Sequence, residues 1–222
     1  MVKSLAAIVG AAAMLASTHA LSGAAVNQYP LHAAAEYNDV NAVKQLLSEG
    51  AKIEARDASG STALLAATRA NAVDAARALI NAGADVNAKD RINDSAYLYA
   101  GARGHLDILK MTLSHNADLQ STNRYGGTAL IPAAERGHVE TVKTLIEAGV
   151  AVDHVNNLGW TALLEAIILG NGGQRHQQIV SLLLKAGANP DLADREGVTP
   201  LQHARSRGYS EIESALLAAG KR

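Results

Sequence analysis

Histidine is the residue type in this chain with the widest capacity for chemistry, because imidazole can transfer protons and bind metals near neutral pH. The sequence contains eight histidines and no cysteine. No two histidines form an HExxH motif or an i, i+4 pair that would place both imidazoles on one helix face. There is also no GxSxG motif, and a thiol nucleophile is excluded. We therefore expect no catalytic residue, no metal site and no cofactor, and we predict that the protein is not an enzyme.

Carboxylates could also do acid–base work, but their positions favour a structural role. Asp85 and Asp90 lie in polar segments between apolar stretches. Aspartate in such segments commonly accepts hydrogen bonds from nearby backbone N–H groups. We therefore expect these side chains to stabilise turns.

Two regular series of residues indicate which elements position these side chains. One series is Gly50, Gly83, Asn116, Gly149, Gly187 and Gly220, separated by 33, 33, 33, 38 and 33 residues. A second series, in step with it, begins the segments YPLHAAA, TALLAAT, SAYLYAG, TALIPAA, TALLEAI and TPLQHAR. Self-similarity at such a period predicts a stack of repeated units instead of a single globular core.

The unit ending at Gly149 shows how one repeat should fold. Thr128 is a suitable N-cap residue for a short helix over residues 129–136, which Gly137 ends. Residues 138–147 carry apolar side chains at helical spacing and predict a second helix, which Gly149 ends in the left-handed conformation. Pro132 should remove one early helical hydrogen bond to Thr128 and leave a carbonyl free on the inner face. Two such short helices need neighbouring units to cover their apolar faces.

These motifs resemble the ankyrin-repeat family over residues 29–220, most clearly in GSTALLAAT (60–68), GGTALIPAAERGHVETVKTLIEAG (126–149) and GVTPLQHARSRGY (197–209). The resemblance implies an all-α repeat solenoid, an ankyrin stack of about six helix pairs joined by β-hairpin-like turns. It also implies that His32 bridges neighbouring units, and that His105 and His138 are scaffold residues. The expected units are residues 29–50, 62–83, 95–116, 128–149, 161–187 and 199–220.

The fifth unit is five residues longer than the others, and the extra residues lie between its two helices. Three glycines among residues 170–173 predict a mobile loop there. A glycine-rich segment before a helix is also compatible with phosphate binding, but no Lys-Ser or Lys-Thr of a Walker pattern follows. We favour an insertion at residues 170–178 without a ligand.

The first 20 residues have the pattern of a secretory signal peptide. Lys3 precedes the charge-free run Leu5–Ala16, and small residues allow cleavage after Ala20 or, alternatively, after Ala24. The run is shorter than the roughly 18–20 apolar residues of a membrane span. We therefore expect residues 1–20 to be removed and residues 21–222 to form an exported ankyrin-repeat domain, periplasmic or secreted, without membrane attachment.

The composition limits the class of partner. The formal net charge is −1, and no basic run of five residues occurs, so nucleic acid is not an expected partner. In ankyrin stacks, partners contact the turn tips and the first-helix face. The chain's single Trp lies on a predicted tip, and Trp, Tyr and Arg are enriched at interface hot spots. The alternative is that Trp160 and Tyr125 only rigidify the turns. The candidate protein-binding residues are Arg91, Ile92, Tyr99, Arg124, Tyr125, Leu158, Trp160 and Glu165.

The functional prediction is a monomeric, non-enzymatic protein–protein interaction module exported to the bacterial periplasm. The chain is similar to small exported bacterial ankyrin proteins, some of which support a periplasmic enzyme such as a catalase, and a periplasmic enzyme is therefore one expected partner. The alternative is a secreted effector or immunity protein that acts on a host or a competitor.

Overall fold

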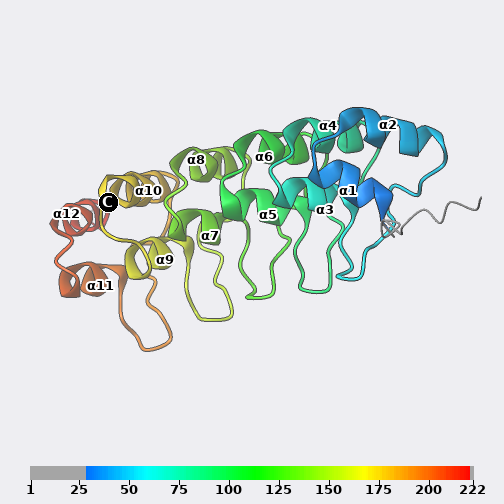
Figure 1. The fold of residues 1–222 in the computed structure, drawn as a ribbon. Helices are drawn as coiled ribbons and strands as arrows, with labels where there is room; N and C mark the ends of the chain where they lie inside the picture. Colours follow the sequence, from blue (N-terminus) through cyan, green and yellow to red (C-terminus); the bar gives the residue numbers. More distant parts are fainter. Residues whose placement is uncertain (1–28, 221–222) are drawn as a thin grey trace, which may run out of the picture.

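The protein forms a stack of helix pairs arranged in two rows (Figure 1). The computed structural model describes residues 29–220. The first helices of the pairs form one row, the second helices form the other, and the long turns project beyond the first row. Within the described residues there are twelve helices and no strand. The pairs are α1 (Pro30–Glu36) and α2 (Val40–Ser48), α3 (Ala63–Arg69) and α4 (Val73–Asn81), α5 (Ala96–Arg103) and α6 (Leu106–Leu113), α7 (Leu130–Glu135) and α8 (Val139–Glu147), α9 (Ala162–Ile168) and α10 (Gln174–Lys185), and α11 (Pro200–Ser206) and α12 (Ser210–Ala219).

The fold class predicted from the sequence, an all-α repeat stack of about six helix pairs, is confirmed. Each pair lies within one of the expected units. The predicted signal peptide lies outside the described residues. In the described part, no helix is both long and apolar enough to cross a membrane.

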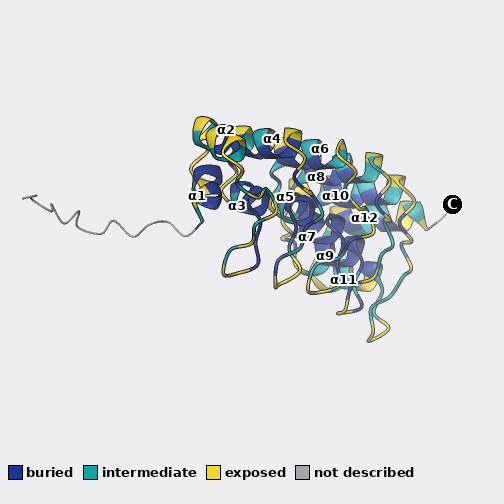
Figure 2. Cartoon of the chain, turned by 90° about the vertical axis from the view of Figure 1, so that its right-hand side faces the viewer, coloured by how far each residue is buried: buried dark blue, intermediate teal, exposed yellow. Residues whose placement is uncertain are grey.

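The core consists mostly of small and branched apolar residues from both rows of helices. Figure 2 shows buried residues in the helices of both rows. Each first helix packs on the first helix of the next repeat, and each second helix on the next second helix. The repeats approach closely: a Cβ added at Gly101 of α5 would lie 2.7 Å from the Cβ of Ala129. This spacing explains why alanine and leucine dominate the sequence and large aromatic side chains are few.

Side-chain caps begin most of the first helices. Thr62, Ser95, Thr161 and Thr199 each accept a hydrogen bond from the backbone N–H three residues later. The same role predicted for Thr128 is wrong, because its hydroxyl is buried without a hydrogen-bond partner.

Pro132 is the reason for this exception. It has no N–H to donate to the Thr128 carbonyl, and the first turn tightens so that the Ile131 N–H reaches that carbonyl at 3.3 Å. The free carbonyl that we expected is therefore absent, and the Thr128 hydroxyl loses its partner instead.

The five long turns share one hydrogen-bonding device. In each, a turn Asx residue accepts two bonds through its Oδ1 atom, from the backbone N–H groups two and four residues later. This confirms the structural role predicted for Asp90. The turn Asx residues are Asp57, Asp90, Asn123, Asn156 and Asp194.

Only part of the insertion in the fifth repeat forms the loop that we expected. Most of the extra residues lengthen α10, which has 12 residues where α8 has 9. The short loop before it is held by hydrogen bonds: the Asn171 Oδ1 atom contacts the Gly173 N–H and His176 Nδ1, and the Tyr209 hydroxyl donates to the Gly170 carbonyl at 3.1 Å. Gly172 is packed against the Tyr209 ring.

Candidate functional site

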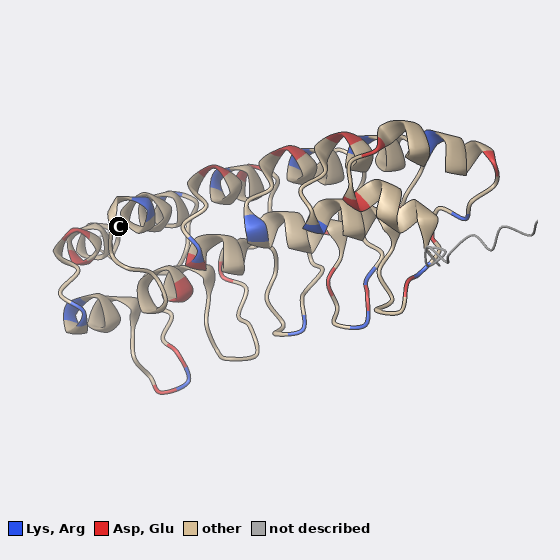
Figure 3. Cartoon of the chain, in the orientation of Figure 1, with Lys and Arg blue, Asp and Glu red and all other residues tan. Residues whose placement is uncertain are grey.

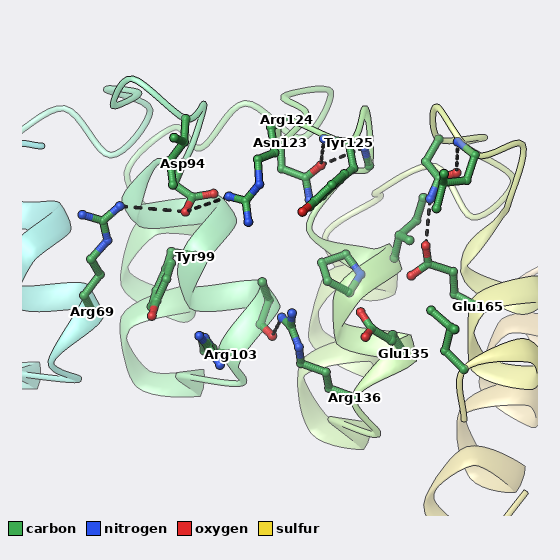
Figure 4. A pocket seen from close by; sticks show the side chains of 18 residues that line it. Arg69, Asp94, Tyr99, Arg103, Asn123, Arg124, Tyr125, Glu135, Arg136 and Glu165 are labelled. Atoms are coloured by element: carbon green, nitrogen blue, oxygen red, sulfur yellow. Dashed lines mark hydrogen bonds and ion pairs between the residues drawn. The ribbon is translucent and has the colours of Figure 1, made fainter. Parts of the chain in front are cut away.

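A groove of about 550 Å³ runs along the first-helix row, between the turn tips and helices α5, α7 and α9 (Figure 4). Six of the eight residues proposed from the sequence line this groove: Ile92, Tyr99, Arg124, Tyr125, Leu158 and Glu165. Arg91 and Trp160 do not line it. Arg91 is exposed and lies against the neighbouring turn, where its N–H bonds the Ser59 carbonyl at 3.2 Å. Trp160 is half-buried.

Three apolar side chains on successive turn tips form one wall of the groove. Ile92, Tyr125 and Leu158 follow one another at intervals of 33 residues, and they are 46%, 54% and 50% exposed. The Asx-supported turns hold them in register, because the Leu158 N–H, for example, is bonded to Asn156. The repeat thus produces a row of apolar side chains that solvent can reach.

One end of the groove is rich in arginine. Asp94 lies between Arg69 and Arg124, with each guanidinium 3.9 Å from its Oδ2 atom (Figure 4). Arg69 also pairs with the buried Asp90. Burial, with the neighbouring Asp90 carboxylate, raises the pKa of Asp94 above its ordinary value. Arg124 also lies 4.7 Å from the centre of the Tyr125 ring.

The Tyr99 ring is in contact with two arginine side chains. The guanidinium carbons of Arg69 and Arg103 are 5.8 Å and 5.5 Å from the ring centre. Such contacts hold the cations over the aromatic face but leave the Arg103 N–H groups available for other partners. Within the described residues Arg103 has no ion pair and no side-chain hydrogen bond.

The other end of the groove is acidic. Glu165 of α9 is only 6% exposed, and its Oε1 atom accepts a 2.8 Å hydrogen bond from Asn156. Burial, and secondarily the nearby Glu135 carboxylate, raise the pKa of Glu165 from 4.5 to about 7. Asn156 and Arg136 oppose this shift only in part.

The histidines are parts of the scaffold. His32, as the resemblance implied, reaches the next repeat, with its Nε2 atom 2.8 Å from the Ser61 carbonyl. His105, His154 and His176 make the same kind of contact with backbone carbonyls of a neighbouring repeat. The described residues include no group of three or more His, Asp or Glu placed to hold a metal.

Sequence reasoning missed Arg69, Arg103, Glu135 and Arg136, all of which line the groove. They lie at or near the ends of the first helices, three or four residues after positions that face the turns, such as Tyr99 and Pro132. Extending Tyr99 by one helical turn would have found Arg103, since residues at i, i+3 and i+4 share a helix face. Arg69 follows Ala66, and Glu135 and Arg136 follow Pro132, and neither of those earlier residues was a candidate. Asn156 was missed as well, because its sequence position indicates only a turn.

Charged residues of both signs are interspersed over the outer helices and the turns (Figure 3), and the groove also holds both signs, with Asp94 among the arginines at one end and Arg136 near Glu165 at the other. A carboxylate pair, arginines and an apolar row can recognise polar and apolar groups of a ligand. They lack a nucleophile activated by an adjacent base.

The chain is similar to known ankyrin-repeat proteins in sequence and in structure. A family model described as "Ankyrin repeats (3 copies)" matches residues 4–90 and 97–194. A crystal structure of an ankyrin repeat domain from Acinetobacter baumannii AYE is 72% identical, with a TM-score of 0.85, and the match covers 87% of this chain and 99% of that one. The Enterococcus ankyrin repeat protein EF0377 is 43% identical, with a TM-score of 0.82, over 85% and 96%. The Escherichia coli (strain K12) ankyrin repeat protein YahD is 55% identical over 56 residues, which are 25% of this chain and only 28% of that protein.

Proposed function

The chain belongs to the ankyrin-repeat family, whose domains are generally protein-binding modules, and on that premise we propose that it binds a partner protein through the groove, without catalysis. The observation that carries this proposal is the row formed by Ile92, Tyr125 and Leu158. Three large, half-exposed apolar side chains in one register line the same groove as Tyr99 and a set of arginines. Contiguous exposed apolar surface bordered by polar groups is a feature of protein interaction sites.

The proposal makes the groove side chains, and not Trp160, the main contacts. Tyr125 is 54% exposed and lines the groove, whereas Trp160 is half-buried and does not line it. A binding role for Tyr125 can therefore be tested separately from a role for Trp160.

The test uses the purified chain to capture partners from an envelope extract, followed by affinity measurement with the captured protein. We expect Tyr125→Ala to weaken binding by about 2 kcal/mol while the helical circular dichroism signal is unchanged. Lys143→Ala, on the exposed side of α8, is the control and should have no effect. Equal affinity of Tyr125→Ala and the wild-type protein would contradict the proposed site.

We also propose that the protein is exported to the periplasm of a bacterium. This rests on the signal-peptide pattern of residues 1–20 and on the bacterial origin of the relatives. Mass analysis of the native protein should find a start at Leu21 or Ala25. An intact Met1 in the cytosolic fraction would overturn the export proposal and leave the binding proposal untouched.

A further inference from the structure

Glu165 is a buried carboxylate that forms no ion pair among residues 29–220, and Arg136 compensates its charge only in part. It occupies the position that Tyr99 and Pro132 occupy in the two preceding repeats, where no charge is present. Its support is a neutral amide, Asn156, and within residues 29–220 no Lys, Arg or His lies within 4 Å of its oxygens. Burying an ionised carboxylate is costly unless a cation compensates it. The ionised Glu165 carboxylate would therefore be stabilised by an additional cation.

The second carboxylate, Glu135 of α7, adds to this requirement. Glu135 lines the same end of the groove and makes no ion pair in the described part of the protein. Figure 4 shows it beside the groove, between Arg136 and Glu165. Two carboxylates that share a partly buried site repel each other, and a cation placed between them would relieve both.

The protein's own cations do not serve this purpose. Arg136, the nearest of them, is directed toward α5, where its Nη1 atom donates to the Ala102 carbonyl at 2.6 Å (Figure 4). Arg69 and Arg124 are paired with Asp94 at the other end of the groove. In the next repeat, His203 is paired with Asp194. Arg103, which has no ion pair in the described part of the chain, lies over the Tyr99 ring. The acidic end is therefore compensated only in part, by Arg136, and it is open to the groove.

We propose that the Glu135–Glu165 end of the groove binds a basic side chain, Lys or Arg, from an extended segment of the partner protein. The inference rests on the proposed function and names what the groove recognises. The apolar row would contact neighbouring side chains of the same segment. The arginines at the opposite end would repel a second basic side chain there, which fixes the place of the first.

Binding of the basic side chain would be coupled to the protonation of Glu165. The groups that face this carboxyl are Glu135 and Arg136 from α7 and Asn156 from the preceding turn. In the free protein the carboxyl holds its proton to unusually high pH, and a bound ammonium or guanidinium group would favour the ionised form. The affinity for a basic peptide should therefore rise as the pH is raised from below to above neutrality.

The probe is a random peptide display library, selected separately on the wild-type protein, on Glu165→Gln and on Glu147→Gln. The Gln side chain keeps an acceptor for Asn156, so the first variant should retain the fold. Glu147 is exposed on α8, which makes its variant the matched control for loss of one negative charge. We expect the wild-type protein and the control to select peptides with Lys or Arg at one fixed position, and Glu165→Gln to lose that preference.

A selected lysine peptide is then measured by calorimetry. Replacement of its lysine by norleucine, or of Glu165 by glutamine, should each weaken binding about tenfold, and the two changes together should weaken it no further. Only the protein with Glu165 should show the rise of affinity with pH. Selected peptides without a basic preference, or a preference retained in Glu165→Gln, would overturn this inference alone. If no peptide is bound by any of the three proteins, the proposed function fails together with it.

Discussion

The fifth and sixth repeats contain the same hydrogen bond with different chemistry. In each, a turn Asx residue contacts the side chain nine residues later: Asn156 donates to Glu165 at 2.8 Å, and His203 is bonded to Asp194 at 2.7 Å. In both, the Asx residue also accepts two backbone N–H groups of its turn. The scaffold therefore fixes the position of the second side chain without fixing its charge.

The difference between the two pairs shows where charge is left for a ligand. The hydrogen bond from His203 is the main cause that lowers the pKa of Asp194, so the Asp194 carboxylate is stabilised within its own repeat. In the fifth repeat the acid is at the other position, and burial, with the nearby Glu135 carboxylate, raises the pKa of Glu165 to about 7, because the hydrogen bond from the neutral Asn156 amide offsets only part of this effect. The same geometry stabilises a turn in one repeat and presents a carboxylate to the groove in the other.

The largest effect should come from removing the fifth turn Asx residue. Asn156→Ala deletes the Oδ1 atom that accepts two turn bonds and the Nδ2 donor to Glu165, and Asn156 is only 6% exposed, so water cannot replace all of these bonds. We expect a loss of about 2–3 kcal/mol in the free energy of unfolding, measured by urea denaturation. Asp194→Ala should cost less, because its turn is more exposed. Equal losses in the free energy of unfolding would mean that the two pairs stabilise their turns to the same extent.

The second prediction concerns the charge of Glu165. Its pKa is raised by folding from 4.5 to about 7. Below the lower value the carboxyl is protonated in both states. Between the two values the unfolded chain releases the proton first, so the stability of the wild-type protein falls as the pH rises. Above about pH 7 Glu165 is ionised in both states, and the full free-energy cost of burying its charge destabilises the folded state.

Glu165→Gln removes this penalty. The shift corresponds to at most roughly 3 kcal/mol, at about 1.4 kcal/mol per pH unit, and local relaxation reduces it. We expect the variant to be more stable than the wild-type protein by about 1–2 kcal/mol at about pH 8, and the two to be equal near about pH 4. Denaturation at both pH values measures this. A variant that is less stable at the higher pH would show that Glu165 is already compensated in the free protein.

The sequence predicted the helix pairs better than it predicted the start of α7 and the conformation of the inserted segment. The 33-residue period and the helix-breaking glycines predict the helix pairs, and Gly149 does have a positive φ of 91°. The N-cap at Thr128 was predicted wrongly because Pro132, four residues later, changes the first turn. The insertion was predicted only in part because glycine content alone does not reveal that Tyr209 of the next repeat packs on Gly172.

The groove was predictable only in part, for a similar reason. Tip residues such as Tyr125 follow from the period, since each repeat presents the same turn position. The contact between Asn156 and Glu165 depends on how the turn folds back on its own helix, which no local pattern indicates. Asp94 meets Arg69 and Arg124, and Glu165 meets Glu135 and Arg136, only when consecutive repeats are stacked, so these groups become visible only in three dimensions.

The smallest effect should come from Asp194→Asn, and its sign should be opposite to that of Glu165→Gln. The pKa of Asp194 is lowered by folding, first through the bond from His203. A carboxyl of this kind stabilises the folded state above its unfolded pKa, and this contribution is lost as the pH falls through the folded value. The asparagine keeps an Oδ1 acceptor for the turn, so the variant removes the charge and the Oδ2 acceptor of the His203 bond but leaves the turn bonds in place. We expect a small decrease in the thermal midpoint at neutral pH that disappears in strong acid, followed by helical circular dichroism. A shift of the midpoint in the same direction for Asp194→Asn and Glu165→Gln at neutral pH would mean that the two repeats compensate their charges in the same way. The Glu165 carboxylate would then not be left for a ligand.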